Sequence, residues 1–114
     1  MPPGSTTASP LPASEFQILL ALADSAPGVG SAIKDEIAER TGGDVVLGPG
    51  TLYTSVKRML AAGLIAEVHD GSDRVRAYRM TAAGRMAAAA EARRLERLVA
   101  DAREKRLLRP LRPA

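Results

Sequence analysis

The sequence predicts a mainly α-helical fold with one small antiparallel β-hairpin and one long helix near its C-terminal end. Three observations lead to this prediction. Three early segments carry apolar residues at helical spacing, two strand-like runs flank a glycine-containing turn, and residues 82–108 contain a single glycine and no proline. A chain of 114 residues is long enough for one small domain with a modest core.

Composition excludes several classes of function. The chain has no cysteine and a single histidine, His69, so we expect no disulfide, no transition-metal site and no cofactor. No apolar stretch approaches the ~18–20 residues of a membrane span. Residues 1–12 are rich in proline and hydroxyl side chains, unlike a signal peptide, and we expect them to be disordered. These features predict a cytoplasmic protein with no membrane partner.

The central segment, residues 47–65, has the features of one amphipathic helix from Pro49 to about Ala62. Gly48 is suited to the N-cap and Pro49 to the first helical position, whereas Gly63 is a natural end signal. The inward stripe consists of Leu52, Val56, Met59 and Leu60, and the outward face carries Gly50, Thr51, Thr54, Lys57, Arg58 and Ala61.

The outward face of this helix suits a polyanion, because no acidic residue occurs between Gly50 and Ala66. An ordinary surface helix with a solvated cationic edge is the alternative interpretation. The charge distribution favours the first interpretation: residues 1–48 carry a net −4, residues 49–84 a net +2 and residues 85–114 a net +5. Basic charge therefore begins at the helix in question.

Two helices are expected before it. The first spans about residues 13–25, with Ser14 and Gln17 as a capping box, and the second spans about residues 30–40. We expect Lys34 and its acidic neighbours on the second helix to point outward, on a face unsuited to DNA. A short strand is expected at residues 45–47. Two short helices joined by a turn or brief connector, the second of which carries the cationic face, form a helix-turn-helix organisation.

A β-hairpin is expected to follow. Residues 64–69 and 74–80 are strand-like and the turn residues 70–73 separate them. Tyr78 and Met80 should lie nearest the core, and Arg74 and Arg76 nearest the tip, where arginines can reach phosphates. Ordinary solvated strand charges are the alternative interpretation.

The last predicted element is one long helix over about residues 82–108, with Thr81 as its N-cap, followed by a basic tail at residues 109–114. Such a helix is longer than a small core can cover, so it needs another partner. Its apolar stripe predicts a homodimer interface made of Leu95, Leu98, Val99 and Ala102.

The runs Gly50-Thr51-Leu52-Tyr53, Lys57-Arg58-Met59 and Gly63-Leu64-Ile65 resemble the recognition-helix signature of PadR-type winged helix-turn-helix transcription regulators. With flanking matches, the resemblance covers roughly residues 16–106. It implies that residues 13–80 form a winged helix-turn-helix domain that binds double-stranded DNA, and that residues 81–108 form the dimerisation helix of a short member. The DNA contacts would be Gly50, Thr51, Tyr53, Thr54, Lys57, Arg58, Arg74 and Arg76.

The resemblance also implies a repressor that a small-molecule effector releases. Since the chain has no tryptophan and only three aromatic residues, we expect mainly aliphatic groups to hold such an effector, in a cavity near Phe16 and Leu20. We find no phosphate loop, nucleophile motif or convergent acid pair, and therefore predict no enzyme. The remaining alternative is a winged-helix protein-interaction module. Thr51, Thr54, Lys57 and Arg58 argue against it, because a protein-docking face would carry exposed aromatic or leucine side chains.

Overall fold

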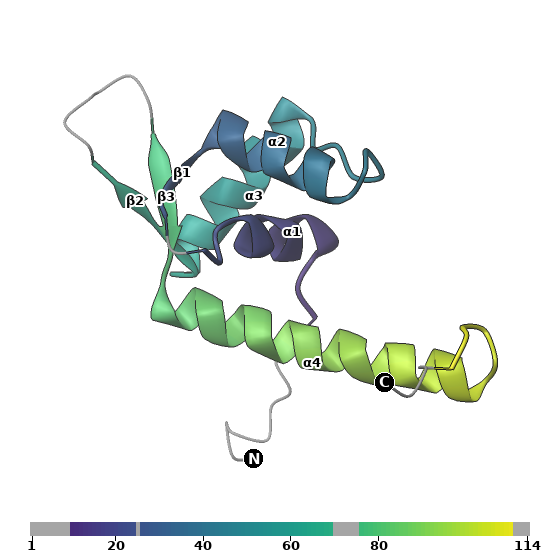
Figure 1. The fold of residues 1–114 in the computed structure, drawn as a ribbon. Helices are drawn as coiled ribbons and strands as arrows, with labels where there is room; N and C mark the ends of the chain where they lie inside the picture. Colours follow the sequence, from purple (N-terminus) through teal and green to yellow (C-terminus); the bar gives the residue numbers. More distant parts are fainter. Residues whose placement is uncertain (1–9, 25, 70–75, 111–114) are drawn as a thin grey trace, which may run out of the picture.

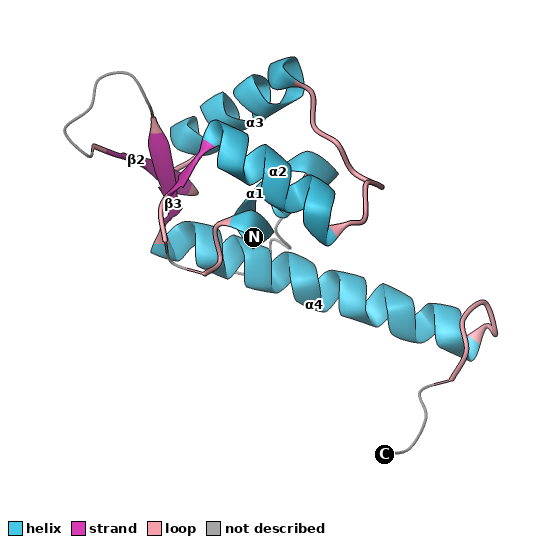
Figure 2. Ribbon diagram, turned by 45° about the horizontal axis from the view of Figure 1, so that its top comes forward, coloured by secondary structure: helices cyan, strands magenta, loops and turns pink. Residues whose placement is uncertain are grey.

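In a computed structural model of the protein, residues 10–24, 26–69 and 76–110 are described. The hairpin turn and Arg74 therefore lie outside the described residues. Within them, three helices pack together, a small sheet lies at one end, and the last helix runs beside the bundle and past it (Figure 1, Figure 2). The elements are α1 (Ala13–Ala21), β1 (Gly28–Val29), α2 (Gly30–Arg40), α3 (Pro49–Ala61), β2 (Ile65–Val68), β3 (Ala77–Met80) and α4 (Ala82–Glu104).

The core is built from aliphatic side chains of the first three helices and the segments between them. Met59 of α3 is fully buried and Val56 is 7% exposed, whereas Leu52 and Leu60 are half-buried beside them, as the stripe on this helix predicted. The largest fully buried side chains are Ile18, Leu19, Leu22, Ile33, Ile37 and Met59. This packing fixes which face of α3 is turned outward.

The sheet has three strands in the order β1-β3-β2, all antiparallel. The predicted hairpin is confirmed: Ile65 pairs with Met80 and Val68 pairs with Ala77. The third strand, β1, was not predicted. Two residues are too few to show strand periodicity, and pairing with the central strand β3 defines this one.

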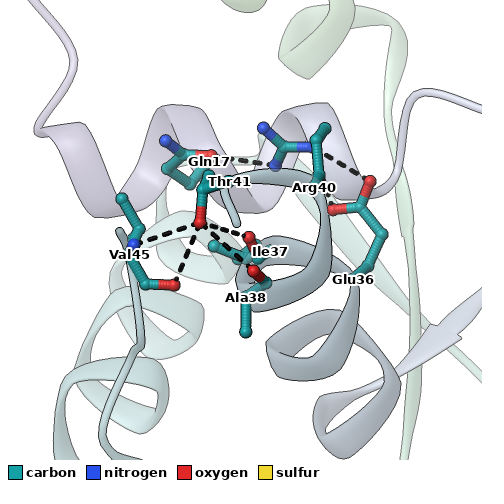
Figure 3. A network of polar contacts seen from close by, with 7 residues as sticks. All are labelled: Gln17, Glu36, Ile37, Ala38, Arg40, Thr41 and Val45. Atoms are coloured by element: carbon teal, nitrogen blue, oxygen red, sulfur yellow. Dashed lines mark hydrogen bonds and ion pairs between the residues drawn. The ribbon is translucent and has the colours of Figure 1, made fainter. Parts of the chain in front are cut away.

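The strand predicted at residues 45–47 was wrong. Residues 45–48 have no regular secondary structure, and the hydroxyl of Thr41 accepts a hydrogen bond from the Val45 amide at 3.0 Å while donating one to the Ile37 carbonyl at 2.8 Å (Figure 3). The Val45 amide is bound to the end of α2, and Leu47 is buried in the core. Residues 45–48 are therefore an anchored loop that connects α2 to α3.

The predicted capping box was also wrong. Helix α1 begins directly after Pro12, so Ser14 already lies inside the first turn, and no side chain in the described part of the chain caps the helix. Instead Gln17 accepts a 2.8 Å hydrogen bond from Arg40, which also pairs with Glu36 at 3.0 Å and so joins α1 to α2 (Figure 3). The helix ends at Ala21, earlier than expected, in a turn through residues 22–24.

Two chain connections meet at the base of the sheet. Gly63, with φ 76°, ends α3 in the left-handed conformation that glycine adopts readily, as the sequence predicted. Its carbonyl accepts a hydrogen bond from the Thr81 hydroxyl at 2.6 Å, and the Leu64 carbonyl accepts one from the Thr81 amide at 3.1 Å. Thr81 also caps α4 by accepting a hydrogen bond from the Gly84 amide at 3.0 Å, as predicted.

The last helix is shorter than the expected residues 82–108. It ends at Glu104, because Arg106 adopts a left-handed conformation with φ 65° and the Leu107 amide bonds back to the Ala102 carbonyl at 2.8 Å. This is the Schellman pattern that usually employs glycine. With arginine at that position, the sequence carried no end signal.

A buried carboxylate joins α4 to the start of α1. Glu91 is 6% exposed, accepts a hydrogen bond from the Leu11 amide at 3.2 Å, and is bound by both Nε and Nη2 of Arg94. The hydrogen bond from Arg94 holds the pKa of Glu91 below its ordinary value, although burial opposes that shift. The ionised form of Glu91 therefore stabilises the fold.

We predict that Gly84→Ala destabilises the protein by about 2–3 kcal/mol. A Cβ at this position would lie 2.0 Å from the Leu64 carbonyl oxygen, so the backbone would have to move. Gly50→Ala is the matched control: its Cβ meets open space in a helix, and it should stabilise the fold by up to about 1 kcal/mol. Urea unfolding at equal protein concentration measures both changes, and equal stabilities would contradict the close approach at Gly84.

We also predict a loss of stability in acid. Because the pKa of Glu91 is lowered in the folded state, its contribution is fully present above the unfolded value of about 4.3 and is lost as pH falls through the lower folded value. Thermal melts between about pH 2 and 7 should show a smaller loss for Glu91→Gln, which keeps an acceptor for the Leu11 amide. Parallel melting curves for the two proteins would contradict this role.

Candidate nucleic-acid interface

The outward face of α3 is presented as the sequence predicted. Gly48 is the N-cap with extended backbone, and Pro49 is the first helical residue, since proline lacks the amide hydrogen that would be unpaired there. Between Pro49 and Ala61 the helix contains no acidic residue. All six predicted contacts on this helix are exposed, with Tyr53 at 68%: Gly50, Thr51, Tyr53, Thr54, Lys57 and Arg58.

One edge of α3 is attached to α1 by polar contacts. Ser55 is buried and its hydroxyl lies 3.0 Å from that of Ser14. Nε of Arg58 lies 3.6 Å from Oε2 of Glu15, a carboxylate that is 5% exposed although it belongs to the first turn of α1. The guanidinium of Arg58 therefore compensates a buried charge while remaining largely open to solvent.

The opposite edge of α3 faces the sheet. Arg76, just before β3, is exposed, and its Nη1 lies 3.6 Å from Oε2 of Glu67 on β2. His69 lies 3.7 Å from the other oxygen of the same carboxylate. Such exposed pairs contribute at most about 1 kcal/mol, so Arg76 can exchange this partner for another anion at small cost. Arg74 lies outside the described residues.

A cavity of about 580 Å³ opens between the start of α2, the sheet edge of α3 and strand β3. Its apolar walls are Val29, Pro49, Leu52, Val56 and Leu60, and its polar and cationic groups are Ser31, Lys34, Tyr53, Lys57, Arg76 and Tyr78. We call this cavity the α2-α3 groove. Lys34 and Ser31 were not predicted as part of a site, because Lys34 was expected to lie on an outward acidic face. The signal was present, because Lys34 directly follows the buried Ile33 and so borders the apolar stripe of α2.

The structure thus brings three of the predicted contacts together. Tyr53 and Lys57 belong to α3, whereas Arg76 lies just before β3, and all three side chains line the same groove. Thr51 and Thr54 are exposed on α3 and do not line the groove. Phe16 and Leu20, the residues expected near an effector, lie on α1; Phe16 is half-buried and Leu20 is 36% exposed, and neither belongs to the core cluster.

Among the residues that the structure describes, the apolar stripe of α4 is only partly covered over its second half. Helix α4 is 23 residues long, or about 34 Å, and its C-terminal half extends past the bundle (Figure 2). Leu98 is 51% exposed and Val99 38% exposed, and Leu95 and Ala102 are half-buried. In residues 10–24, 26–69 and 76–110, no helix is long and apolar enough to cross a membrane, and no three metal-ligating side chains come together.

Comparison with known proteins gives one family and one fold. A family model described as "Transcriptional regulator PadR-like family" matches residues 18–90, which is more than half of the chain. No curated protein sequence matches.

Several solved structures share the winged-helix fold. A transcriptional regulator from Clostridium thermocellum, Cth-833, is 24% identical with a TM-score of 0.68, over 80% of this chain and 87% of that one. BpsR from Bordetella bronchiseptica is 22% identical with a TM-score of 0.66, over 87% of this chain and 70% of that one. The DNA binding of BpsR is regulated by 6-hydroxynicotinic acid. The PcaV regulator from Streptomyces coelicolor, solved with its natural ligand, is 18% identical with a TM-score of 0.66 over 82% of this chain. The match spans 62% of PcaV, less than two thirds of that protein.

Proposed function

This chain belongs to the PadR-like family of transcriptional regulators, and from that premise we propose that it binds duplex DNA sequence-specifically as a homodimer. One observation carries the proposal. The exposed face of α3 holds hydroxyl, small and cationic side chains with no acidic residue, and it lies beside another arginine, Arg76, just before the central strand β3. These are the side-chain types that contact phosphates and base edges. In each protomer, α3 enters a major groove and the hairpin acts as the wing.

The contacts divide by chemistry and position. Gly50 permits close approach of the α3 backbone to DNA, and Thr51, Thr54 and Arg58 contact base edges. Arg58 keeps the nearby Glu15 carboxylate as a second partner, since its guanidinium offers several donors. The residues proposed to bind phosphates are Tyr53, Lys57, Arg74 and Arg76.

The projecting half of α4 supports the homodimer. Leu98 and Val99 expose aliphatic surface that a second copy of the same helix would cover, because a symmetric pair places the same stripe on both sides of the interface. Leu95 and Ala102 complete this stripe. Two protomers joined in this way would present two α3 helices to a pseudo-palindromic operator.

We propose that the protein is a repressor that a small molecule releases, in keeping with two of its structural neighbours. PcaV was solved with a natural ligand and the DNA binding of BpsR responds to 6-hydroxynicotinic acid. Phe16 and Leu20, on the surface of α1, are proposed as part of an effector site between α1 and α4, two helices that contact each other.

The function is tested by footprinting on DNA around the protein's own coding region. We expect protection of two half-sites about one helical turn, ~34–36 Å, apart. Weak binding to every sequence, abolished by modest salt, would contradict specific regulation and would favour the protein-interaction alternative.

The division of roles on α3 gives a second expectation. Lys57→Ala should weaken binding to all sequences about equally and reduce the slope of log affinity against log salt by about one unit, because one phosphate contact is lost. Arg58→Ala should instead relax the preference at particular base pairs, at a cost of about 1–3 kcal/mol on the best site. Binding titrations at several salt concentrations measure both effects. If both variants retain full affinity and slope, α3 is not the reading helix.

We predict that Leu98→Asp abolishes the dimer and DNA affinity with it, because an unpaired charge would be buried in the interface and a single half-site offers few contacts. Ala100→Asp is the matched control: it adds the same charge to the exposed opposite side of α4 and should leave the dimer intact. Sedimentation velocity measures the assembly state. A Leu98→Asp protein that stays dimeric and binds DNA normally would assign the exposed stripe to another partner.

A further inference from the structure

We propose that the α2-α3 groove is a ligand site for an amphipathic carboxylic acid with an aliphatic body, and that the acid excludes DNA directly. This inference rests on the proposed function, because exclusion requires that Lys57 and Arg76 contact DNA. It places an anion-responsive site beside the proposed DNA-contact face of α3, and the lining of this site does not include Phe16 or Leu20, the proposed effector residues on α1.

The volume and walls of the groove define the body of the ligand. About 580 Å³ falls within the range of small-molecule sites, and the walls are mainly aliphatic. Leu52 and Leu60, which line it, are half-buried, and the lining residue Val56 is buried. A DNA phosphodiester would leave these apolar walls unfilled, whereas a medium-length alkyl chain would cover them and release water.

The charges define the head group. Lys34 and Lys57 line the groove from α2 and α3, and neither makes an ion pair within residues 10–24, 26–69 and 76–110. Arg76 adds a third cation whose partner, Glu67, is held weakly at 3.6 Å. Among the described residues, no acidic side chain lines the groove. A single carboxylate lying among these cations would find charge-assisted hydrogen bonds beside an apolar cavity.

The first turn of α2 adds a favourable dipole. Gly30 and Ser31 line the groove. The amides of a first helical turn have no intrahelical acceptor, and no side chain among the described residues caps α2. Gly30 also offers a way to fill the site. A Cβ on Gly30 would lie 3.4 Å from Leu52 Cδ2, an ordinary contact directed into the groove.

Competition follows from shared residues. Tyr53, Lys57 and Arg76 line the groove and are also proposed phosphate contacts, so the same side chains cannot hold the carboxylate and the DNA backbone together. Linkage is reciprocal: the factor by which the bound acid lowers the affinity for DNA equals the factor by which bound DNA lowers the affinity for the acid.

The experiment uses decanoate as the probe and decan-1-ol as its uncharged match, with binding to the dimeric protein measured by calorimetry in the absence of DNA. Decanoate should bind about tenfold more tightly than the alcohol. Lys34→Met should weaken decanoate severalfold and leave the alcohol unchanged, because it removes the charge and keeps an apolar side chain. Gly30→Leu should weaken both ligands. Lys105→Met, at the exposed end of α4, is the control and should change neither.

The second measurement adds decanoate to the protein bound to its footprinted operator. Decanoate should displace DNA from the wild type and the Lys105→Met protein, at concentrations that rise severalfold for Lys34→Met. Equal decanoate affinity in all four proteins would place the ligand elsewhere, such as on the α4 stripe, and would overturn the proposal. So would an absence of decanoate binding by a protein that still protects its operator.

The rival occupant, a DNA phosphate, gives a different pattern. If the groove bound the DNA backbone through Lys34, then Lys34→Met would weaken all DNA sequences and lower the salt slope by about one unit, and that result would overturn the proposal. Ligand binding that follows the groove variants in a protein that binds no DNA would instead overturn the proposed function while supporting the site.

Discussion

The outward chemistry of α3 depends on one packing contact, that between its apolar stripe and helices α1 and α2. Met59 is fully buried and Val56 nearly so, against a core that contains Ile18 and Ile37. Because successive helical residues are rotated by 100°, burying these two positions turns Thr51, Thr54 and Arg58 to the opposite side. The core contains little aromatic surface, so close packing of aliphatic groups supplies most of its stability.

A second constraint links α3, the proposed reading helix, to α4, the proposed dimerisation helix. Three residues separate α3 from β2, and one residue separates β3 from α4. Both connections are bound to each other, since Thr81 donates to the carbonyls of Gly63 and Leu64, and Gly84 leaves no space for a side chain. A change in how two α4 helices pair would therefore be transmitted to the spacing of the two α3 helices. In this way the proposed dimer would set the length of the operator.

The parts of the fold that the sequence predicted are those in which local signals agree with tertiary packing. Gly48-Pro49 at the start of α3, Gly63 at its end and Thr81 before α4 are all local signals, and each was confirmed. The apolar stripe of α3 followed from periodicity, and the presence of a hairpin followed from two strand-like runs around turn residues, whereas its register was not predicted. The exposed positions of the DNA-contact residues on α3 followed from the same periodicity, whereas their roles remain predictions.

The parts that could not be predicted depend on contacts between residues distant in sequence, or on a residue in a backbone conformation that its type rarely adopts. Strand β1 exists because β3 pairs with it, and Ser14 bonds to Ser55 instead of capping its own helix. Arg106 adopts a conformation that glycine normally takes. The α2-α3 groove is formed by the start of α2, by α3 and by residues at β3, which are distant in sequence. Lys34 was therefore expected to be an ordinary solvated charge on α2.

Two cations of the proposed DNA surface are partly neutralised by the scaffold, and this affects specificity. Arg58 lies beside Glu15 and Arg76 beside Glu67, whereas Lys57 makes no ion pair within the described part of the chain. Non-specific affinity grows with the number of cations that release counterions from phosphates, so carboxylates at this surface lower it. The base-edge contacts proposed for Arg58 would be weakened less by its carboxylate neighbour than phosphate contacts are. The reason is that a guanidinium can keep one acceptor and bind another. The scaffold carboxylates would thus reduce binding to random DNA more than binding to the operator, and the ratio of the two affinities is the quantity on which a regulator depends.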